Sequence, residues 1–310
     1  MKKDVTPLLW TLVLLNVVLT LVNAVFPNHI PVPLLIPIFI VVPLAFALLH
    51  GAVRYQWSGI LTFLVMCLVV SNVLENTSIL TGFPFGHYHY TSDLGPKLFL
   101  VPLVIGPAYF GTGYLAWVLS TVLIGEVRPK GSWFTTFAVP FIASFMMVAW
   151  DLGMDPTSST IRHSWIWEQG GGYFGVPFTN YLGWFFTVYV FFQLFALSLR
   201  FRKASSDGEE PTFTRSYYAQ AIVMYAMIGL VIVVNYLVVS TNTAITDAVG
   251  IVWQTRSIAE AEATVSIYTM LFAAALSAVK VLQGSAAVAS TPAEAETGET
   301  AVKERSPVRR

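Results

Sequence analysis

Charged side chains are scarce in this sequence. Only 11% of the 310 residues are Asp, Glu, Lys or Arg, whereas a soluble globular domain normally carries about 25%. Hydrophobic residues make up 55%, and long apolar runs recur from near the first residue to about position 282. A helix needs about 20 such residues to cross a hydrocarbon core. This pattern excludes an ordinary soluble protein and leaves no room for a sizeable soluble domain.

Cysteine is nearly absent, and the positive and negative charges cancel. Cys67 is the single cysteine, which excludes an internal disulfide, a CxxC redox pair and a cysteine-based metal site. The formal net charge is zero, and no basic segment interleaved with aromatic residues is present. Proteins that bind nucleic acid need such positive charge to neutralise phosphates, so we expect no nucleic-acid partner.

The apolar runs predict an all-α fold, a polytopic membrane helix bundle with about eight transmembrane helices. The predicted spans are roughly 7–26, 33–50, 58–76, 98–124, 133–152, 178–199, 218–240 and 264–282. We expect one transmembrane helical domain over residues 1–283, with its motif-bearing core at 58–199. Residues 284–310 are rich in Ala, Ser, Thr, Pro and Glu, and predict a disordered cytoplasmic tail.

The distribution of Lys and Arg predicts the orientation. Eight spans place 14 of the 17 basic residues on the side of the amino terminus and only Lys97, Arg162 and Arg256 on the other. Positive loop charge is retained on the cytoplasmic side. We therefore expect both termini in the cytoplasm and the protein in the cell membrane as a multi-pass protein.

The loops on the predicted outer face carry most of the polar residues that are candidates for catalysis or binding. Glu75 ends the third span, Asp151 ends the fifth, and Asp155 follows one helical turn later. An ionisable residue at the rim of a span is costly and is by default a functional hypothesis. The loop after the third span and the loop after the fifth span lie on the same membrane face. The three carboxyl groups are therefore able to converge. An acid beside Trp and Tyr faces suits chemistry that passes through a carbocation.

Each of these features also has a structural interpretation. Trp and Tyr at helix ends form the ordinary interfacial belt of membrane proteins, and Gly and Pro near 82–86 and 170–177 form tight turns. Glu75 and Asp151 are also candidates for helix packing through polar contacts. His87 and His89 alternate with tyrosines and could share one side of an extended segment, but without a third ligand they do not define a metal site. The segment 241–262 is either a lid or an interfacial helix.

Several motifs in predicted spans three to six resemble the membrane carotenoid hydratase family, which includes bisanhydrobacterioruberin hydratases and gamma-carotene 1',2'-hydratases. The matching motifs are Glu75-Asn76, Gly82-Phe83-Pro84-Phe85-Gly86-His87-Tyr88-His89-Tyr90, Trp150-Asp151-Leu152, Asp155-Pro156, Trp165-Ile166-Trp167 and Gly171-Gly172-Tyr173-Phe174-Gly175-Val176-Pro177-Phe178-Thr179-Asn180. The resemblance implies a carotenoid biosynthesis enzyme, and most directly the conversion of bisanhydrobacterioruberin, an acyclic C50 carotenoid, to bacterioruberin.

The implied reaction adds water to the terminal C=C bonds by acid–base catalysis through a tertiary carbocation, and it requires no cofactor. Candidate catalytic residues are Glu75, Asp151 and Asp155. Candidate substrate-binding residues are Asn76, His87, Tyr88, His89, Tyr90, Trp150, Trp165, Trp167, Tyr173 and Asn180. Expected partners are the carotenoid, water and membrane lipid, with association with other carotenoid biosynthesis enzymes left open. Two alternatives remain: a carotenoid-binding or transporting membrane protein, and a cofactor-free carotenoid cyclase.

Overall fold

The computed structural model describes residues 5–26, 37–203, 213–238 and 241–289. Within these ranges, seven helical segments are long and apolar enough to cross a membrane. They are Thr6–Val25, Phe39–Thr81, Ile105–Ile124, Trp133–Ile161, Phe178–Arg200, Arg215–Val238 and Thr255–Gly284. The chain is therefore a polytopic helical membrane protein, which confirms the predicted fold class.

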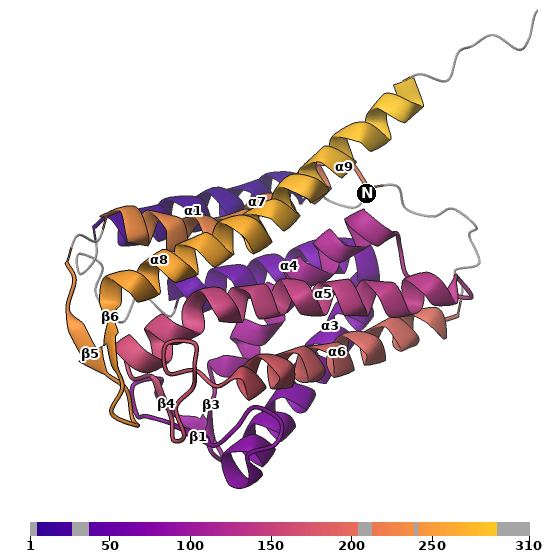
Figure 1. The fold of residues 1–310 in the computed structure, drawn as a ribbon. Coiled ribbons are helices and arrows are strands. Elements are labelled where there is room, and N and C mark those ends of the chain that lie inside the picture. Colours follow the sequence, from indigo (N-terminus) through magenta and orange to yellow (C-terminus); the bar gives the residue numbers. More distant parts are fainter. Residues whose placement is uncertain (1–4, 27–36, 204–212, 239–240, 290–310) are drawn as a thin grey trace, which may run out of the picture.

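The bundle consists of long helices joined by loops with short strands (Figure 1). The helices are α1 (Thr6–Val25), α3 (Val42–Thr81), α4 (Ile105–Ile124), α5 (Trp133–Asp155), α6 (Phe178–Arg200), α7 (Arg215–Val238), α8 (Thr255–Ser266) and α9 (Phe272–Ala289). Three π-helical turns adjoin them: η1 (Pro37–Val41), η2 (Pro156–Ile161) and η3 (Ile267–Leu271). The strands are β1 (Tyr88–Tyr90), β2 (Lys97–Leu98), β3 (Val101–Pro102), β4 (Trp165–Trp167), β5 (Ala244–Thr246) and β6 (Val252–Gln254).

The second and third predicted spans form the single element α3. Its backbone leaves the helical region at Gln56, with φ 60° and ψ 168°. Both sides of this break pack on the first half of α4, because Pro43 lies against Gly111 and Leu68 lies against Gly106. A straight helix would separate positions 43 and 68 by about 37 Å, so the two arms fold back along each other. Because the chain reverses without a loop, the second and third predicted helices count as one segment. This explains why the structure has seven such segments in the described residues and the sequence predicts eight.

The ends of other helices also differ from the predicted ones. Some polar residues are buried within helices, and some apolar residues lie outside them in strands and loops. The span predicted from position 98 begins at Ile105, since residues 97–102 pair as β2 and β3. The fifth span continues through η2, and the last one begins at Thr255 and ends at Ala289. Positions 33–36 of the second predicted span, 239–240 of the seventh, and 290–310 of the predicted tail lie outside the described residues.

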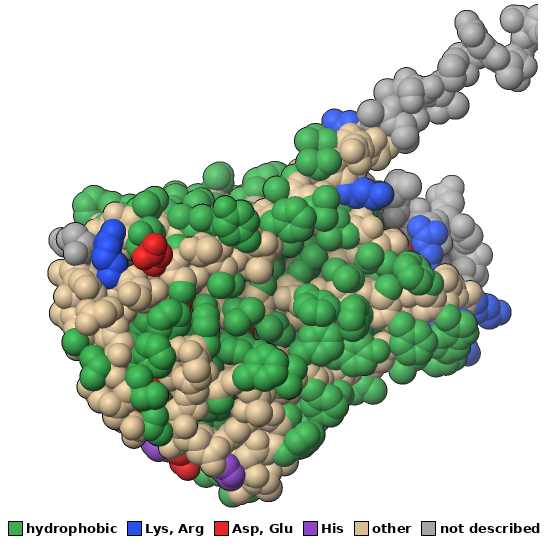
Figure 2. Space-filling view, in the orientation of Figure 1, with side chains coloured by type: hydrophobic (Ala, Val, Ile, Leu, Met, Phe, Trp, Pro, Cys, Tyr) green, Lys and Arg blue, Asp and Glu red, His purple; other side chains and the backbone are tan. Residues whose placement is uncertain are grey.

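Helix α4 forms the centre of the bundle. Every residue from Tyr109 to Thr121 is buried, as expected for a helix that is apolar around its whole circumference. On the outer helices, by contrast, large apolar side chains such as Leu80, Phe134 and Tyr268 are exposed. Figure 2 shows such hydrophobic side chains covering the flank of the bundle, with Lys and Arg at its ends. This surface suits contact with lipid.

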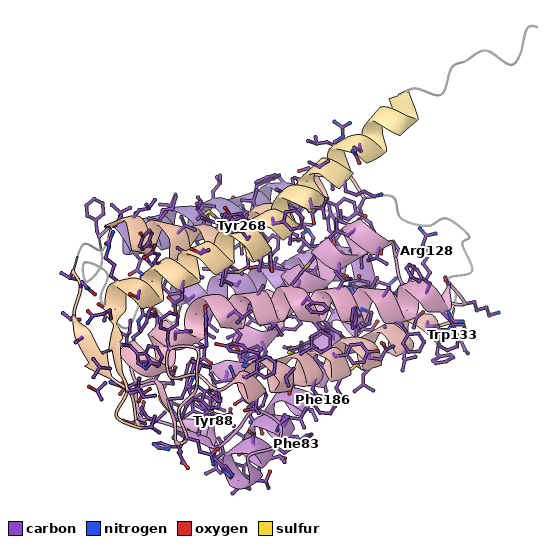
Figure 3. The ribbon with its side chains drawn as sticks, in the orientation of Figure 1. Phe83, Tyr88, Arg128, Trp133, Phe186 and Tyr268 are labelled. Carbon is purple, nitrogen blue, oxygen red and sulfur yellow. The ribbon has the colours of Figure 1, made fainter. Side chains whose placement is uncertain are left out.

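The two ends of the bundle differ in character. Strands β1, β3, β4, β5 and β6 gather at one end (Figure 1), and Figure 3 places Tyr88 there and Arg128 and Trp133 at the opposite end. At that opposite end the guanidinium of Arg200 lies 3.7 Å from the ring centre of Trp133, and Arg202 donates a hydrogen bond to the Tyr55 carbonyl. The loops predicted on the outer face are thus brought together by the strands.

Candidate active site

The ribbon formed by β1 and β4 directs aromatic side chains toward the helices. The strands pair antiparallel, so that Tyr88 lies opposite Trp167 and Tyr90 lies opposite Trp165. Alternate residues of a strand point to opposite faces, and here Tyr88 and Tyr90 are buried while His89 between them is exposed. The ribbon therefore covers the end of the bundle with two tyrosines and two tryptophans.

Glu75 lies beneath this ribbon near the end of α3, with only 3% of its surface exposed. Its Oε2 accepts hydrogen bonds from the hydroxyls of Tyr88 and Tyr90, the second at 2.8 Å, and its Oε1 accepts one from Tyr109 at 2.7 Å. A carboxylate can accept all three, whereas a protonated carboxyl would need an acceptor for its own hydrogen. The three phenols thus stabilise the charged form of Glu75.

The ribbon tyrosines are held in their protonated, donating form. Burial raises the pKa of Tyr88 and of Tyr90 well above the usual range, and the neighbouring Glu75 charge raises it further. A buried phenolate beside a carboxylate is disfavoured both by desolvation and by repulsion between like charges. Both hydroxyls therefore remain hydrogen-bond donors at neutral pH.

Two further carboxyl groups lie one turn apart on α5. Asp151 and Asp155 are each 1% exposed, and their i, i+4 spacing places them on one face of the helix. The side-chain nitrogen of Asn180, near the start of α6, donates to Asp151 Oδ2 and to Asp155 Oδ2, both at 2.8 Å. One amide therefore connects the two acids across the α5–α6 contact.

The remaining oxygens of this pair differ. Asp155 Oδ1 accepts hydrogen bonds from the indole nitrogens of Trp165 at 2.7 Å and Trp167 at 3.4 Å. Asp151 Oδ1 is buried and has no hydrogen-bond partner among the described residues. A buried carboxylate oxygen without a donor is costly, whereas a protonated oxygen there could donate to a bound molecule. The pair is thus asymmetric, with Asp155 well supplied with donors and Asp151 not.

The three carboxyl groups line a single cavity of about 50 Å³. Among the predicted site residues, Glu75, Tyr88, Tyr90, Trp150, Asp151, Asp155, Trp165, Trp167 and Asn180 line it. Its less buried wall is largely apolar and consists of Ile105 and Ala108 of α4, Trp150 and Met154 of α5, and Trp165 of β4. The cavity therefore joins an acidic, aromatic interior to an apolar side.

Four of the predicted substrate-binding residues lie elsewhere. Asn76 follows Glu75 and so points about 100° further round the helix; its side-chain oxygen accepts a hydrogen bond from the Leu100 amide at 2.9 Å. That bond fixes the loop between β2 and β3 to α3. Asn76 thus supports the outer loops from a different face.

The other three are His87, His89 and Tyr173. His89 is exposed on the outer face of β1 and pairs with Glu168 at 3.1 Å, while His87 precedes the strand and packs against Gly82. The Tyr173 hydroxyl donates to the Leu152 carbonyl at 3.2 Å. Strand alternation and loop packing, which the motifs do not encode residue by residue, turn these side chains away from the cavity.

Several lining residues were not among the predicted ones. They are Phe85, Ile105, Ala108, Tyr109, Met154 and Trp184. Tyr109 and Trp184 stack with ring centres 4.3 Å apart and planes 3° from parallel. In the sequence Trp184 lies near the end of a predicted span, which is also the signature of the interfacial belt, and Tyr109 lies near the middle of the predicted span 98–124, where an aromatic residue is ordinary core. Only their position in the bundle distinguishes them.

Segment 241–262 is neither a separate interfacial helix nor part of the cavity wall. Strands β5 and β6 form a hairpin, and α8 continues through η3 into α9. Asp247 of the hairpin accepts a hydrogen bond from the Trp253 indole at 2.8 Å. The buried Glu262 of α8 accepts from the amide and the hydroxyl of Thr157, both at 2.7 Å. The two bonds to Glu262 hold η2, and hence the end of α5, in place.

No group of three or more His, Cys, Asp or Glu side chains suited to a metal ion occurs in the part of the chain that the structure describes. The donors around the three acids are phenols, indoles and one amide. This set of donors suits the stabilisation of carboxylates.

Comparison with known proteins places the chain in a family. The pattern of the family described as "Carotenoid biosynthesis protein" matches residues 34–251, which is more than half of the sequence. The chain belongs to this carotenoid biosynthesis family. All three acids and the whole β1–β4 ribbon fall within the matched residues.

One relative is the bisanhydrobacterioruberin hydratase of Haloarcula japonica, which is 33% identical over 122 residues. The match covers 39% of this chain and 39% of that relative, so the chain spans about two fifths of the relative's length. No solved structure matches the chain significantly. Membership of the carotenoid biosynthesis family and the name of this relative both agree with the family that the sequence motifs resemble.

Proposed function

We propose that this protein is a carotenoid hydratase that adds water to the terminal C=C bonds of an acyclic carotenoid. The observation that carries the proposal is the arrangement of Glu75, Asp151 and Asp155 around one aromatic-lined cavity at the strand-bearing end of a lipid-exposed bundle. The reaction needs an acid, a pocket that tolerates positive charge, and water. It changes no net oxidation state, so acid–base chemistry is sufficient and no redox cofactor is required.

We infer that the substrate is bisanhydrobacterioruberin and the product bacterioruberin, as the name of the Haloarcula relative suggests. A cavity volume of about 10–15 Å³ is enough for one water molecule. The cavity at the three acids, of about 50 Å³, therefore accommodates only the end of a long polyene. The remainder would extend past the apolar wall at Ile105, Ala108 and Met154 into the lipid. The apolar wall and the acidic interior thus match the two parts of such a substrate.

In the proposed mechanism Asp151 is the general acid. Its unpartnered Oδ1 donates a proton to the less substituted carbon of the terminal alkene, which leaves a tertiary cation. The negative charge that develops on Asp151 is stabilised by the Asn180 amide at Oδ2. Asp155 stays ionised, since it accepts hydrogen bonds from two indoles and the same amide. Two neighbouring buried carboxyl groups that share one proton provide the required acid and base.

The cation would be stabilised by Glu75 and by the aromatic walls. Three phenols support the negative charge of Glu75, and the π faces of Trp150 and Trp184, whose rings meet edge to face at 5.7 Å, are attractive to positive charge. Water then attacks the tertiary carbon, and its excess proton passes to Asp155. Proton exchange within the aspartate pair returns Asp151 to its protonated state, so that one water is consumed for each alkene.

The test is expression of Glu75→Gln, Asp151→Asn and Asp155→Asn in a host that makes the dehydrated carotenoid, with pigments analysed by mass. We expect the wild-type protein to add the mass of one water per reacting end and each variant to lose most of this product. Full hydration by all three variants would overturn the assignment. A wild-type product of unchanged mass but altered structure would indicate a cyclase, and an unaltered pigment a binding or transport protein.

We also propose that the protein resides in the cell membrane with its strand-bearing end on the outer face, because most of its basic residues belong to loops of the opposite end. Membrane lipid would surround the bundle and deliver the polyene. Tagging each end of the chain and measuring its accessibility in intact cells tests this orientation.

A further inference from the structure

A second, smaller cavity lies next to the candidate active site. Its volume is about 20 Å³. Its wall includes Ser159, Thr160, His163, Trp167, Asp247 and Ala248. They come from η2, the loop after it, β4 and the turn between β5 and β6. Segments that are far apart in the sequence therefore enclose this space.

The cavity extends from the protein surface to the interior. His163 and Ala248 on its wall are exposed, whereas Ser159 and Thr160 are only 3% and 4% exposed. A space of 10–15 Å³ is enough for one water molecule if polar partners are present. The volume and position of this cavity are those of a hydration site with access from outside.

The polar groups of the wall leave acceptors free for a water molecule. The Thr160 hydroxyl uses its hydrogen on the Phe174 carbonyl at 2.6 Å, and the Ser159 hydroxyl uses its hydrogen on the Asp155 carbonyl at 2.8 Å. Each hydroxyl oxygen retains lone pairs, and the Asp247 carboxylate is nearby. A water molecule that donates to these oxygens would be well held.

Among the described residues, one side chain lines both cavities. Trp167 belongs to the wall of each, and its indole nitrogen lies 3.4 Å from Asp155 Oδ1, compared with 2.7 Å for Trp165. The Trp167 bond is thus the weaker of the two by geometry. A small displacement of this ring would connect the outer water site with the carboxylate proposed as the base.

The geometry points to this second cavity as the water inlet of the reaction, with Trp167 as the partition between stored water and the carbocation. The inference rests on the proposed hydratase function and adds a route for one of its two substrates. A cation has two fates: capture by water, which gives the alcohol, or loss of a neighbouring proton, which regenerates an alkene. The inlet sets the ratio between these two products because it controls only the arrival of water.

Deuterium oxide separates the two fates. Membranes that contain the protein and preformed dehydrated carotenoid are incubated in D₂O, and the pigments are analysed by mass. Water capture gives a deuterated alcohol, while protonation followed by proton loss leaves deuterium in the recovered alkene. The ratio of alcohol to labelled alkene therefore reports the water supply and does not depend on the amount of folded protein.

Ala248→Phe is designed to fill the exposed mouth of the cavity. Thr160→Val removes one water acceptor, together with its hydrogen bond to the Phe174 carbonyl, while it preserves the shape of the side chain. Ala244→Phe is the matched control, since Ala244 is exposed on the same hairpin and does not line the cavity. We expect Ala248→Phe to lower the ratio of alcohol to labelled alkene about tenfold and Thr160→Val about threefold, which correspond to about 1.4 and 0.7 kcal/mol. Ala244→Phe should leave the ratio unchanged.

The outcomes are distinguishable. A wild-type ratio in both Ala248→Phe and Thr160→Val would overturn the inlet while the hydratase function stands. If the wild-type protein forms neither alcohol nor labelled alkene, the proposed function fails and the inlet fails with it. An equal decrease with Ala244→Phe would also count against the inlet, because it would show that a bulky residue anywhere on the hairpin has the same effect.

Discussion

Replacement of Asn180 by Leu offers a sharp test of the carboxyl pair. Leucine has the same number and branching of side-chain heavy atoms as asparagine but cannot donate a hydrogen bond. The substitution removes the 2.8 Å bonds to both Asp151 and Asp155 and leaves Asp151 without its only side-chain hydrogen-bond donor among the described residues. The acid and the base of the proposed mechanism would lose the group that connects them.

The expected magnitude follows from the energy of these bonds. A hydrogen bond to a charged group contributes about 1.5–3 kcal/mol. Loss of the bond that stabilises the developing Asp151 carboxylate should therefore slow hydration by about 10- to 100-fold. Because Asp155 also loses a donor, we expect Asn180→Leu to reduce the free energy of unfolding by about 3 kcal/mol.

Asn76→Leu is the matched control for this experiment. Asn76 lies at the same end of the bundle, accepts a hydrogen bond from the Leu100 amide and donates one to the Asn72 carbonyl at 2.7 Å. Neutral hydrogen bonds contribute about 1 kcal/mol each, so this variant should also lose stability. It should nevertheless hydrate the carotenoid at the wild-type rate per folded molecule, since Asn76 does not line the cavity.

The assay measures alcohol formed per folded protein, with the folded fraction obtained by size-exclusion chromatography in detergent. Hydration by Asn180→Leu within about twofold of the wild type would refute the coupled-acid argument, because the lost bond would then contribute well under 1 kcal/mol to the transition state. An equal loss of specific activity in Asn180→Leu and Asn76→Leu would refute it too, since the effect would then be one of general packing.

Three further predictions concern stability and the donors of the site. Burial raises the pKa of Tyr90, so this residue should contribute a fall in stability of about 1.4 kcal/mol per pH unit above about pH 10, because only the unfolded chain ionises there, and Tyr90→Phe should reduce the measured slope by that contribution. Trp165→Phe should impair hydration more than Trp167→Phe, as product analysis would show, because its bond is shorter. Gly183→Ala should destabilise by about 1–3 kcal/mol in thermal unfolding, since its Cβ would meet a loop carbonyl at 2.7 Å, whereas Gly172→Ala has open space.

The sequence by itself determined the membrane-embedded class and most of the helical segments. Hydrocarbon requires long apolar helices, and this requirement leaves a signal in every window of about 20 residues. The carotenoid family could also be anticipated, because its motifs are contiguous stretches such as Trp150-Asp151-Leu152. Glu75 and Asp151 were identifiable as candidates since a carboxyl group at the rim of an apolar span is costly to retain.

Tertiary structure decided the rest. The reversal at Gln56 depends on the backbone angles of a single residue. The hydropathy of the sequence does not predict such angles. The inward direction of Tyr88 and the outward direction of His89 depend on strand register, while Tyr109 and Trp184 become site residues only because α4 and α6 meet. Hydrogen bonds between residues far apart in sequence, such as that from Asn180 to Asp151, distinguish one buried acid from another. Such contacts depend on how helices pack, and no local pattern in the chain specifies them.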